Sequence, residues 1–172
     1  MTALFRQLGY FAVGLDFRPS PLWSRHRHRN FIVGSAESLP FADRSADLCV
    51  SFLALGYVAD DRRAVQEIAR VLKSRGTLLL QLTNKNNLYS VVHRKLLDPQ
   101  HLREYTLPEI ERLLHPHFAV VKRWGEKVYV PICTRFFNYC YELLLGDRGK
   151  ALATALTPLH YRGYFNVLAV KR

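Results

Sequence analysis

Residues 60–82, DDRRAVQEIARVLKSRGTLLLQL, decide the fold class of this 172-residue chain. In the first part of this stretch the apolar residues recur with the spacing of one helical face. They are Ala64, Val65, Ile68, Ala69 and Leu72. The run Thr77–Leu82 that follows is rich in leucine without polar alternation, which is typical of a strand buried on both faces. A helix that leads into such a strand predicts a parallel α/β sheet.

The helix predicted over Asp60–Leu72 carries signals at both ends. Asp60 and Asp61 can cap the free N–H groups of its first turn and favour the helix dipole. Lys73 lies near the other end, and Gly76 predicts the point at which the helix stops.

The alternation of short apolar runs with helical stretches continues in both directions. A second helix is predicted to begin at Thr106, with Pro108 and Glu109 in its first turn. The other predicted strands are Phe11–Leu15, Phe31–Val33, Leu48–Leu53, Phe118–Trp124 and Tyr164–Val170. The length predicts one domain over residues 1–172. The aromatic-rich stretch 128–160 interrupts the pattern, and we expect a helical insertion or cap there, with a helical hairpin that only covers the sheet as an equal alternative.

Charge and composition narrow the class of protein. The chain has 25 Lys and Arg against 14 Asp and Glu, a net charge of +11. Apart from the run Arg25–Arg29 the bases are dispersed, which favours an enzyme with a basic surface over a nucleic-acid-binding protein. No apolar run approaches the roughly 18 residues of a membrane span. With no signal-peptide layout and no C-x-x-C, a cytoplasmic location with free thiols is expected.

Histidine and cysteine residues do not predict a metal site. The pairs His26/His28 and His115/His117 lack the third ligand that zinc sites usually have. Cys133 and Cys140 lie in an apolar stretch and are expected to be core residues.

Four segments, in chain order, resemble one enzyme family. They are VGLDFRPS at 13–20, GSAESLPFAD at 34–43, SADLCVSFLAL at 45–55 and EIARVLKSRGTL at 67–78. Together they resemble the class I S-adenosylmethionine-dependent methyltransferases, in particular the small-molecule, type 11-like branch. The resemblance implies a Rossmann-like sheet, mostly parallel with an antiparallel C-terminal strand pair. It also implies methyl transfer from S-adenosylmethionine to a small-molecule acceptor.

The resemblance assigns candidate site residues. Asp16 would accept both ribose hydroxyls of the cofactor, because a carboxylate offers two oxygens to two vicinal donors. Ser35 stands where the family usually has an acid. The remaining cofactor candidates are Phe17 and Ala36 beside the adenine, Glu37 as a polar neighbour, and Phe52 and Leu53 near the methyl-donor end. The substrate candidates are Tyr57, Asn84, Asn86 and Asn87.

No catalytic residue is assigned. Methyl transfer mainly requires that the acceptor be positioned in line and that water be excluded. A general base helps only where the acceptor must lose a proton.

The resemblance also predicts an N-terminal truncation. In the family a first strand and a glycine-rich loop precede the helix that is expected here over Leu4–Gly9. That strand lies between the strands that correspond to Phe11–Leu15 and Leu48–Leu53, so each would have an unpaired edge. Three explanations stay open: lost upstream sequence, closure of the two strands onto each other, or a strand supplied by a partner. We expect this chain alone to bind S-adenosylmethionine weakly. The alternative function is a non-catalytic methyltransferase-like subunit that acts through a protein partner.

Overall fold

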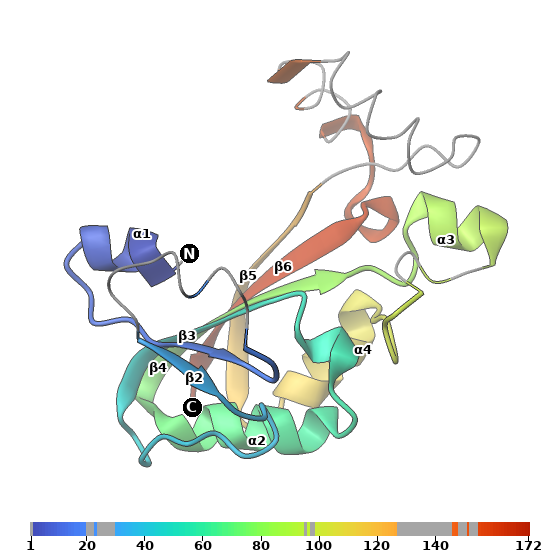
Figure 1. The fold of residues 1–172 in the computed structure, drawn as a ribbon. Coiled ribbons are helices and arrows are strands. Elements are labelled where there is room, and N and C mark those ends of the chain that lie inside the picture. The colour runs from blue at the N-terminus through green and yellow to red at the C-terminus, as the bar shows by residue number, and fades with distance from the viewer. Residues whose placement is uncertain are drawn as a thin grey trace.

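The computed structural model describes residues 2–19, 23, 30–94, 96, 99–126, 146–147, 151 and 155–172. Figure 1 shows strands that run through the middle of the molecule, with helices packed around them. In chain order the elements are α1 (Thr2–Gln7), β1 (Gly14–Asp16), β2 (Phe31–Val33), β3 (Ala46–Phe52), η2 (Leu55–Tyr57), α2 (Asp61–Val71), β4 (Leu72–Thr83), α3 (Leu88–His93), α4 (Leu107–Leu114), β5 (Phe118–Glu126), η3 (Leu159–Tyr161) and β6 (Tyr164–Lys171).

The larger sheet has the strand order β3-β4-β6-β5. β3 and β4 are parallel, whereas β6 is antiparallel to both of its neighbours, β4 and β5. The predicted combination of parallel strands with an antiparallel C-terminal pair is therefore confirmed. β4 is central, because it pairs with β3 on one side and with β6 on the other.

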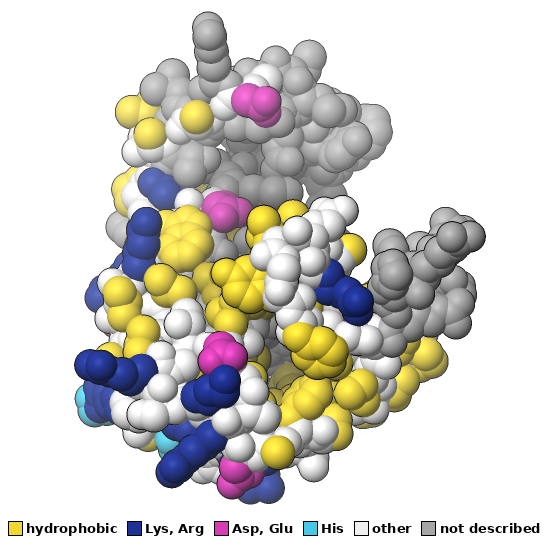
Figure 2. Space-filling view, turned by 90° about the vertical axis from the view of Figure 1, so that its left-hand side faces the viewer, with side chains coloured by type: hydrophobic (Ala, Val, Ile, Leu, Met, Phe, Trp, Pro, Cys, Tyr) yellow, Lys and Arg dark blue, Asp and Glu magenta, His cyan; other side chains and the backbone are white. Residues whose placement is uncertain are grey.

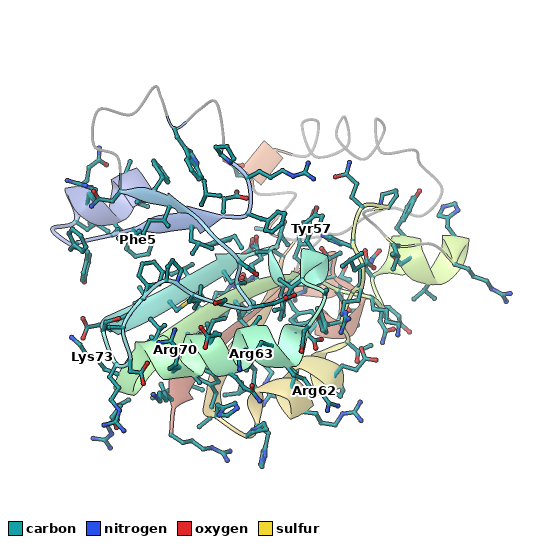
Figure 3. All side chains as sticks on the ribbon, turned by 60° about the horizontal axis from the view of Figure 1, so that its bottom comes forward. Phe5, Tyr57, Arg62, Arg63, Arg70 and Lys73 are labelled. Atoms are coloured by element: carbon teal, nitrogen blue, oxygen red, sulfur yellow. The ribbon has the colours of Figure 1, made fainter. Side chains whose placement is uncertain are left out.

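A second, two-stranded sheet is formed by β1 and β2, which are parallel. Among the described residues β1 does not pair with β3, so of the three open explanations the structure does not show closure of these two strands onto each other. The smaller sheet lies on the β3 side of the larger one (Figures 1 and 3). Leu48 and Phe52 on β3 are 40% and 41% exposed.

The core lies where α2 and α4 cover one face of the larger sheet (Figure 1). α2 buries the apolar face that its spacing predicts, including Ala64, Val65 and Ile68. β4 buries alternate residues, with Leu78, Leu80 and Leu82 on the covered face. The expectation of a strand buried on both faces is thus only half met, because residues on the other face, such as Leu79, are intermediate in exposure.

The predicted end of α2 at Leu72 is correct to within one residue, but the prediction that Gly76 stops the helix is wrong. The helix ends at Val71 and β4 begins at Leu72 with no loop between them. Gly76 lies inside β4, and the chain instead bends where Arg75 takes a φ of 61°, in the left-handed region. A Cβ at Gly76 would come 2.9 Å from the carbonyl oxygen of Lys73, so this glycine allows a close backbone approach.

Several sequence-based expectations lie outside the described residues. Most of the predicted cap over 128–160, the basic run Arg25–Arg29, and Cys133 and Cys140 belong to this group. Among the helices that the structure describes, none is long and apolar enough to cross a membrane.

Candidate functional site

Asp16 is the last residue of β1, and its side chain is exposed. Its Oδ1 accepts a hydrogen bond of 3.3 Å from the backbone N–H of Arg18. The backbone carbonyl of Asp16 accepts from the N–H of Gly34 at 3.0 Å, which ties the end of β1 to the loop after β2. Phe17 follows with 72% of its surface exposed. The structure therefore presents a carboxylate and an aromatic ring together at the end of one strand.

The loop 34–43 after β2 begins with a turn that Ser35 closes. Its Oγ accepts from the N–H of Glu37 at 3.1 Å, and its carbonyl accepts from the N–H of Ser38 at 3.2 Å. Ala36, between them, is half-buried against the core. The Glu37 carboxylate accepts the N–H of Asp60 at 2.9 Å, so the side chain joins this loop to the start of α2. Its predicted role as a polar neighbour of the cofactor stays a prediction.

Arg70 of α2 holds the rest of this loop, and we call the arrangement the Arg70 clamp. Its guanidinium donates to the Glu67 carboxylate at 2.8 and 2.9 Å, to the carbonyls of Leu39 and Phe41 at 2.9 and 2.8 Å, and to Asp43 at 2.6 Å. Glu67 also accepts the N–H of Leu39 at 2.9 Å. Figure 3 labels Arg70 on α2.

The contacts of the clamp shift the pKa values of Glu67 and of Arg70 itself. Hydrogen bonding to Arg70 lowers the pKa of Glu67 to about 2, against the desolvation that acts in the other direction. The same contacts raise the pKa of Arg70 further above its ordinary value. Both groups therefore stay charged at neutral pH, and the loop that carries Ala36 is held to α2 by charge-assisted hydrogen bonds.

The end of β3 carries the next candidates. Phe52 is 41% exposed, and Leu53 has a φ of 53°, a left-handed conformation that is costly for a branched side chain. The N–H of Leu53 nevertheless donates to the carbonyl of Gln81 on β4 at 2.9 Å, which holds the bend. On the same strand, burial raises the pKa of the Cys49 thiol to about 11, so it stays protonated at neutral pH.

The four substrate candidates fall into two groups. Tyr57 is 46% exposed and Asn86 is also exposed. Asn84 and Asn87 are buried and make structural hydrogen bonds. Asn84 donates to the carbonyl of Arg162 at 2.8 Å, and Asn87 caps α3 by accepting the N–H of Ser90 at 2.9 Å. Contact with a substrate remains a prediction for all four, and these bonds weigh against Asn84 and Asn87.

Sequence reasoning assigned no role to His101 and Glu104. The two side chains are 3% and 0% exposed, and His101 Nδ1 lies 3.7 Å from Glu104 Oε1. The ring of Tyr57 meets the His101 imidazole edge-on, with 4.5 Å between ring centroids. The signal available in the sequence was a His and a Glu three positions apart, just before the capped helix α4.

Two further observations concern other places where a ligand or a metal ion could bind. A groove of about 850 Å³ lies between α2 and α4, and none of the sequence-predicted site residues lines it. Its lining includes Arg62, Gln66 and Arg112. Within the described part of the chain, no three His, Cys, Asp or Glu side chains are placed to hold a metal ion.

Together these features make an α/β fold with an acid at the end of β1, a clamped loop after β2 and an antiparallel closing pair of strands. Residues 1–80 match the methyltransferase domain family. A solved S-adenosylmethionine-dependent methyltransferase from Archaeoglobus fulgidus superposes with a TM-score of 0.69 over 98% of this chain and 80% of that one, at 14% identity. The first 80 residues are thus similar to the methyltransferase domain family, and the chain has the fold of a solved S-adenosylmethionine-dependent methyltransferase.

Part of the chain is also similar to curated proteins that are named as methyltransferases. The chain is 33% identical over 110 residues to the uncharacterized methyltransferase YcgJ of Bacillus subtilis (strain 168), a match that covers 55% of this chain and 41% of the relative. It is 41% identical over 76 residues to malonyl-(acyl-carrier protein) O-methyltransferase 1 of Coxiella burnetii, covering 44% of this chain and 26% of that relative. The matched part thus spans less than half the length of either relative.

Proposed function

We propose that this chain binds S-adenosylmethionine and takes part in methyl transfer to a small-molecule acceptor. The observation that carries the proposal is the Asp16 carboxylate, exposed at the carboxyl end of β1 beside an exposed aromatic ring. Among the described residues its side chain accepts a single long hydrogen bond, from the N–H of Arg18. The carboxylate therefore keeps acceptor capacity for two vicinal hydroxyl donors.

The residues present fit the adenosine part of the cofactor. Phe17 and Val33, at or just past the ends of β1 and β2, are 72% and 53% exposed, and Phe52 at the end of β3 is 41% exposed. Such side chains suit a flat, apolar base, and Asp16 suits the ribose. When bound, S-adenosylmethionine supplies a methyl group on a positively charged sulfur. The chain's own contribution is then to bind the cofactor, to orient the acceptor and to exclude water.

The experiment that tests this proposal is a titration of the ¹⁵N-labelled chain with S-adenosylhomocysteine, followed by amide chemical shifts. We expect shifts centred on Asp16, Phe17, Ala36 and Phe52, with the weak affinity anticipated from the sequence. Cytidine serves as the matched control, because it offers the same ribose hydroxyls with a different base. An absence of shifts at millimolar ligand, or shifts confined to the groove between α2 and α4, would contradict the proposal.

The alternative, a non-catalytic subunit that acts through a protein partner, is favoured by neither the family match nor the two curated relatives. It predicts no ligand response at Asp16, so the same titration separates the two functions.

A further inference from the structure

Residues 101–105 lie across the carboxyl ends of two neighbouring parallel strands. The N–H groups of Leu102 and Arg103 donate to the carbonyl of Gly56, just after β3, at 2.8 and 3.3 Å. Tyr105 forms a bridge with Asn84, just after β4, and its carbonyl accepts from the N–H of Lys85 at 2.9 Å. The carboxyl ends of parallel strands are where open α/β sheets bind ligands.

This segment buries an ionisable pair at that edge. The His101 and Glu104 side chains are 97% and fully buried, and 3.7 Å separates Nδ1 of His101 from Oε1 of Glu104. No described residue hydrogen-bonds to Nδ1 of His101. Burying an ionisable pair costs free energy that apolar side chains of the same volume would not.

The packing around His101 determines which ring atom is available. The Cδ2 and Cγ side of the imidazole lies so close to Gly56 that a Cβ there would come within 3.1 and 3.2 Å of these atoms. Nδ1 faces the Glu104 carboxylate. Neither of these two contacts involves the remaining ring nitrogen, Nε2. Tyr57, which is partly exposed, packs edge-on against the same ring.

We propose that His101 and Glu104 form the proton-accepting pair of the methyl-transfer site, which rests on the proposed function above. Glu104 accepts the Nδ1–H of His101 once the 3.7 Å separation closes to hydrogen-bond length. This selects the tautomer with its lone pair on Nε2. Of the two, His101 is the catalytic residue and Glu104 is a positioning residue.

The proton balance of the step defines the class of acceptor. A bond forms between the acceptor oxygen or nitrogen and the methyl carbon, while the carbon–sulfur bond breaks and its electron pair stays on sulfur. The O–H or N–H proton of the acceptor moves to Nε2 of His101 and leaves to solvent after the products depart. The pair is therefore useful for a neutral hydroxyl or amine. An acceptor that is already a carboxylate would not need it.

The first test uses the chain without ligand. Long-range ¹⁵N–¹H spectra of the His101 ring at pH 8 report which nitrogen carries the proton. We expect the Nδ1–H tautomer in the unmodified chain and a mixture of tautomers in Glu104→Gln. A predominant Nε2–H tautomer in the unmodified chain would overturn the proposal, because the proton acceptor would then be occupied.

The second test measures S-adenosylhomocysteine release from S-adenosylmethionine with the low-molecular-weight fraction of a bacterial extract as the acceptor source. His101→Ala should lower the rate at least about a hundredfold, with unchanged cofactor affinity, and added imidazole should restore part of it. Loss without imidazole rescue indicates a structural role and overturns the proposal, as does a rate equal to that of the unmodified chain. If the unmodified chain binds no S-adenosylhomocysteine and releases none, the proposed function itself fails.

Discussion

Two regions of this molecule differ in how they are held together. The larger sheet, together with α2, α4, η2 and the segment 101–105, contains every buried apolar residue of the described core. The first region, α1 with β1 and β2, buries no residue of α1 and exposes Tyr10, Phe11 and Phe17 by 63%, 86% and 72%. Figure 2 views the molecule from the α1 side and shows hydrophobic side chains spread over this face among Lys and Arg.

The difference teaches where stability and ligand chemistry reside. The free energy of folding comes mainly from the larger sheet, because burial of apolar surface is the dominant favourable contribution. The candidate cofactor residues are divided, with Asp16 and Phe17 on the first region and Phe52 and Leu53 on the second. The loop 34–43, held by the Arg70 clamp, joins the two. Stability and cofactor binding should therefore respond to different substitutions.

The largest expected effect is a loss of stability from the larger sheet. Leu80→Ala removes a fully buried side chain from β4 and should lower the free energy of unfolding by about 3 kcal/mol. The matched variant Phe11→Ala, in the first region, should change it by less than about 0.5 kcal/mol. Urea denaturation followed by circular dichroism measures both. Equal effects would show that the two regions share one core.

The second largest expected effect is a loss of ligand binding with no change in stability. Asp16→Ala should weaken S-adenosylhomocysteine binding about ten- to a hundredfold, because one hydrogen bond to a charged group contributes roughly 1.5–3 kcal/mol. Its urea midpoint should stay unchanged. Asp47→Ala is the control, since Asp47 is an exposed acid at the start of β3 and contacts Lys73. An affinity that is unchanged in Asp16→Ala would show that the end of β1 is not part of the cofactor site.

The Arg70 clamp, which joins the two regions, should make the free energy of unfolding depend on pH. Glu67→Gln should lower the free energy of unfolding by about 1.5 kcal/mol at pH 7. Because the folded state lowers the pKa of Glu67 to about 2, the carboxylate's contribution is complete above about pH 4.5 and is lost as the pH falls toward 2. The difference between the two proteins should therefore shrink over that window in thermal melts. Asp43→Asn, at a 73% exposed partner of Arg70, should change stability by less than about 0.5 kcal/mol.

The smallest effect tests backbone strain in the larger sheet. Arg75 is exposed and has a φ of 61°, so Arg75→Gly relieves the left-handed strain while costing chain entropy in the unfolded state. We expect a net gain of about 0.5 kcal/mol, read as a higher melting temperature. Thr77→Gly, two residues on in regular strand, is the control and should destabilise. A loss in Arg75→Gly would show that its side chain makes a contribution greater than the strain.

Hydrophobic pattern predicted most of the sheet. Phe31–Val33 matches β2 at both ends. Asp60–Leu72 differs from α2 by one residue at each end, because this helix buries a regular apolar face. Gly76 was read as a helix stop because glycine commonly follows helices. The fully buried Leu72 instead begins the strand at once, and the glycine serves a close backbone contact. No local pattern distinguishes those two uses.

The site was less predictable than the fold. Asn87 is a substrate candidate only through the resemblance, and in the structure its side chain caps α3 by accepting the N–H of Ser90. Glu67 and Arg70 were recognised as a motif without a role, since their partners Leu39 and Phe41 lie about thirty residues away in sequence. His101 and Glu104 become candidates because the His101 ring packs against Gly56 and Tyr57, and only the folded chain brings these residues together.

The position of β6 between β4 and β5 has a consequence for synthesis of the chain. Thr77 on β4 pairs with Val170, and Ala119 on β5 pairs with the same residue. Until residues 164–171 have left the ribosome, β4 has an open edge and β5 has no strand partner in this sheet. The hydrophobic strand Leu72–Thr83 can therefore pair only with β3 while nearly ninety further residues are translated. That interval is when a nascent chain of this fold is most exposed to aggregation and has the greatest need of a chaperone.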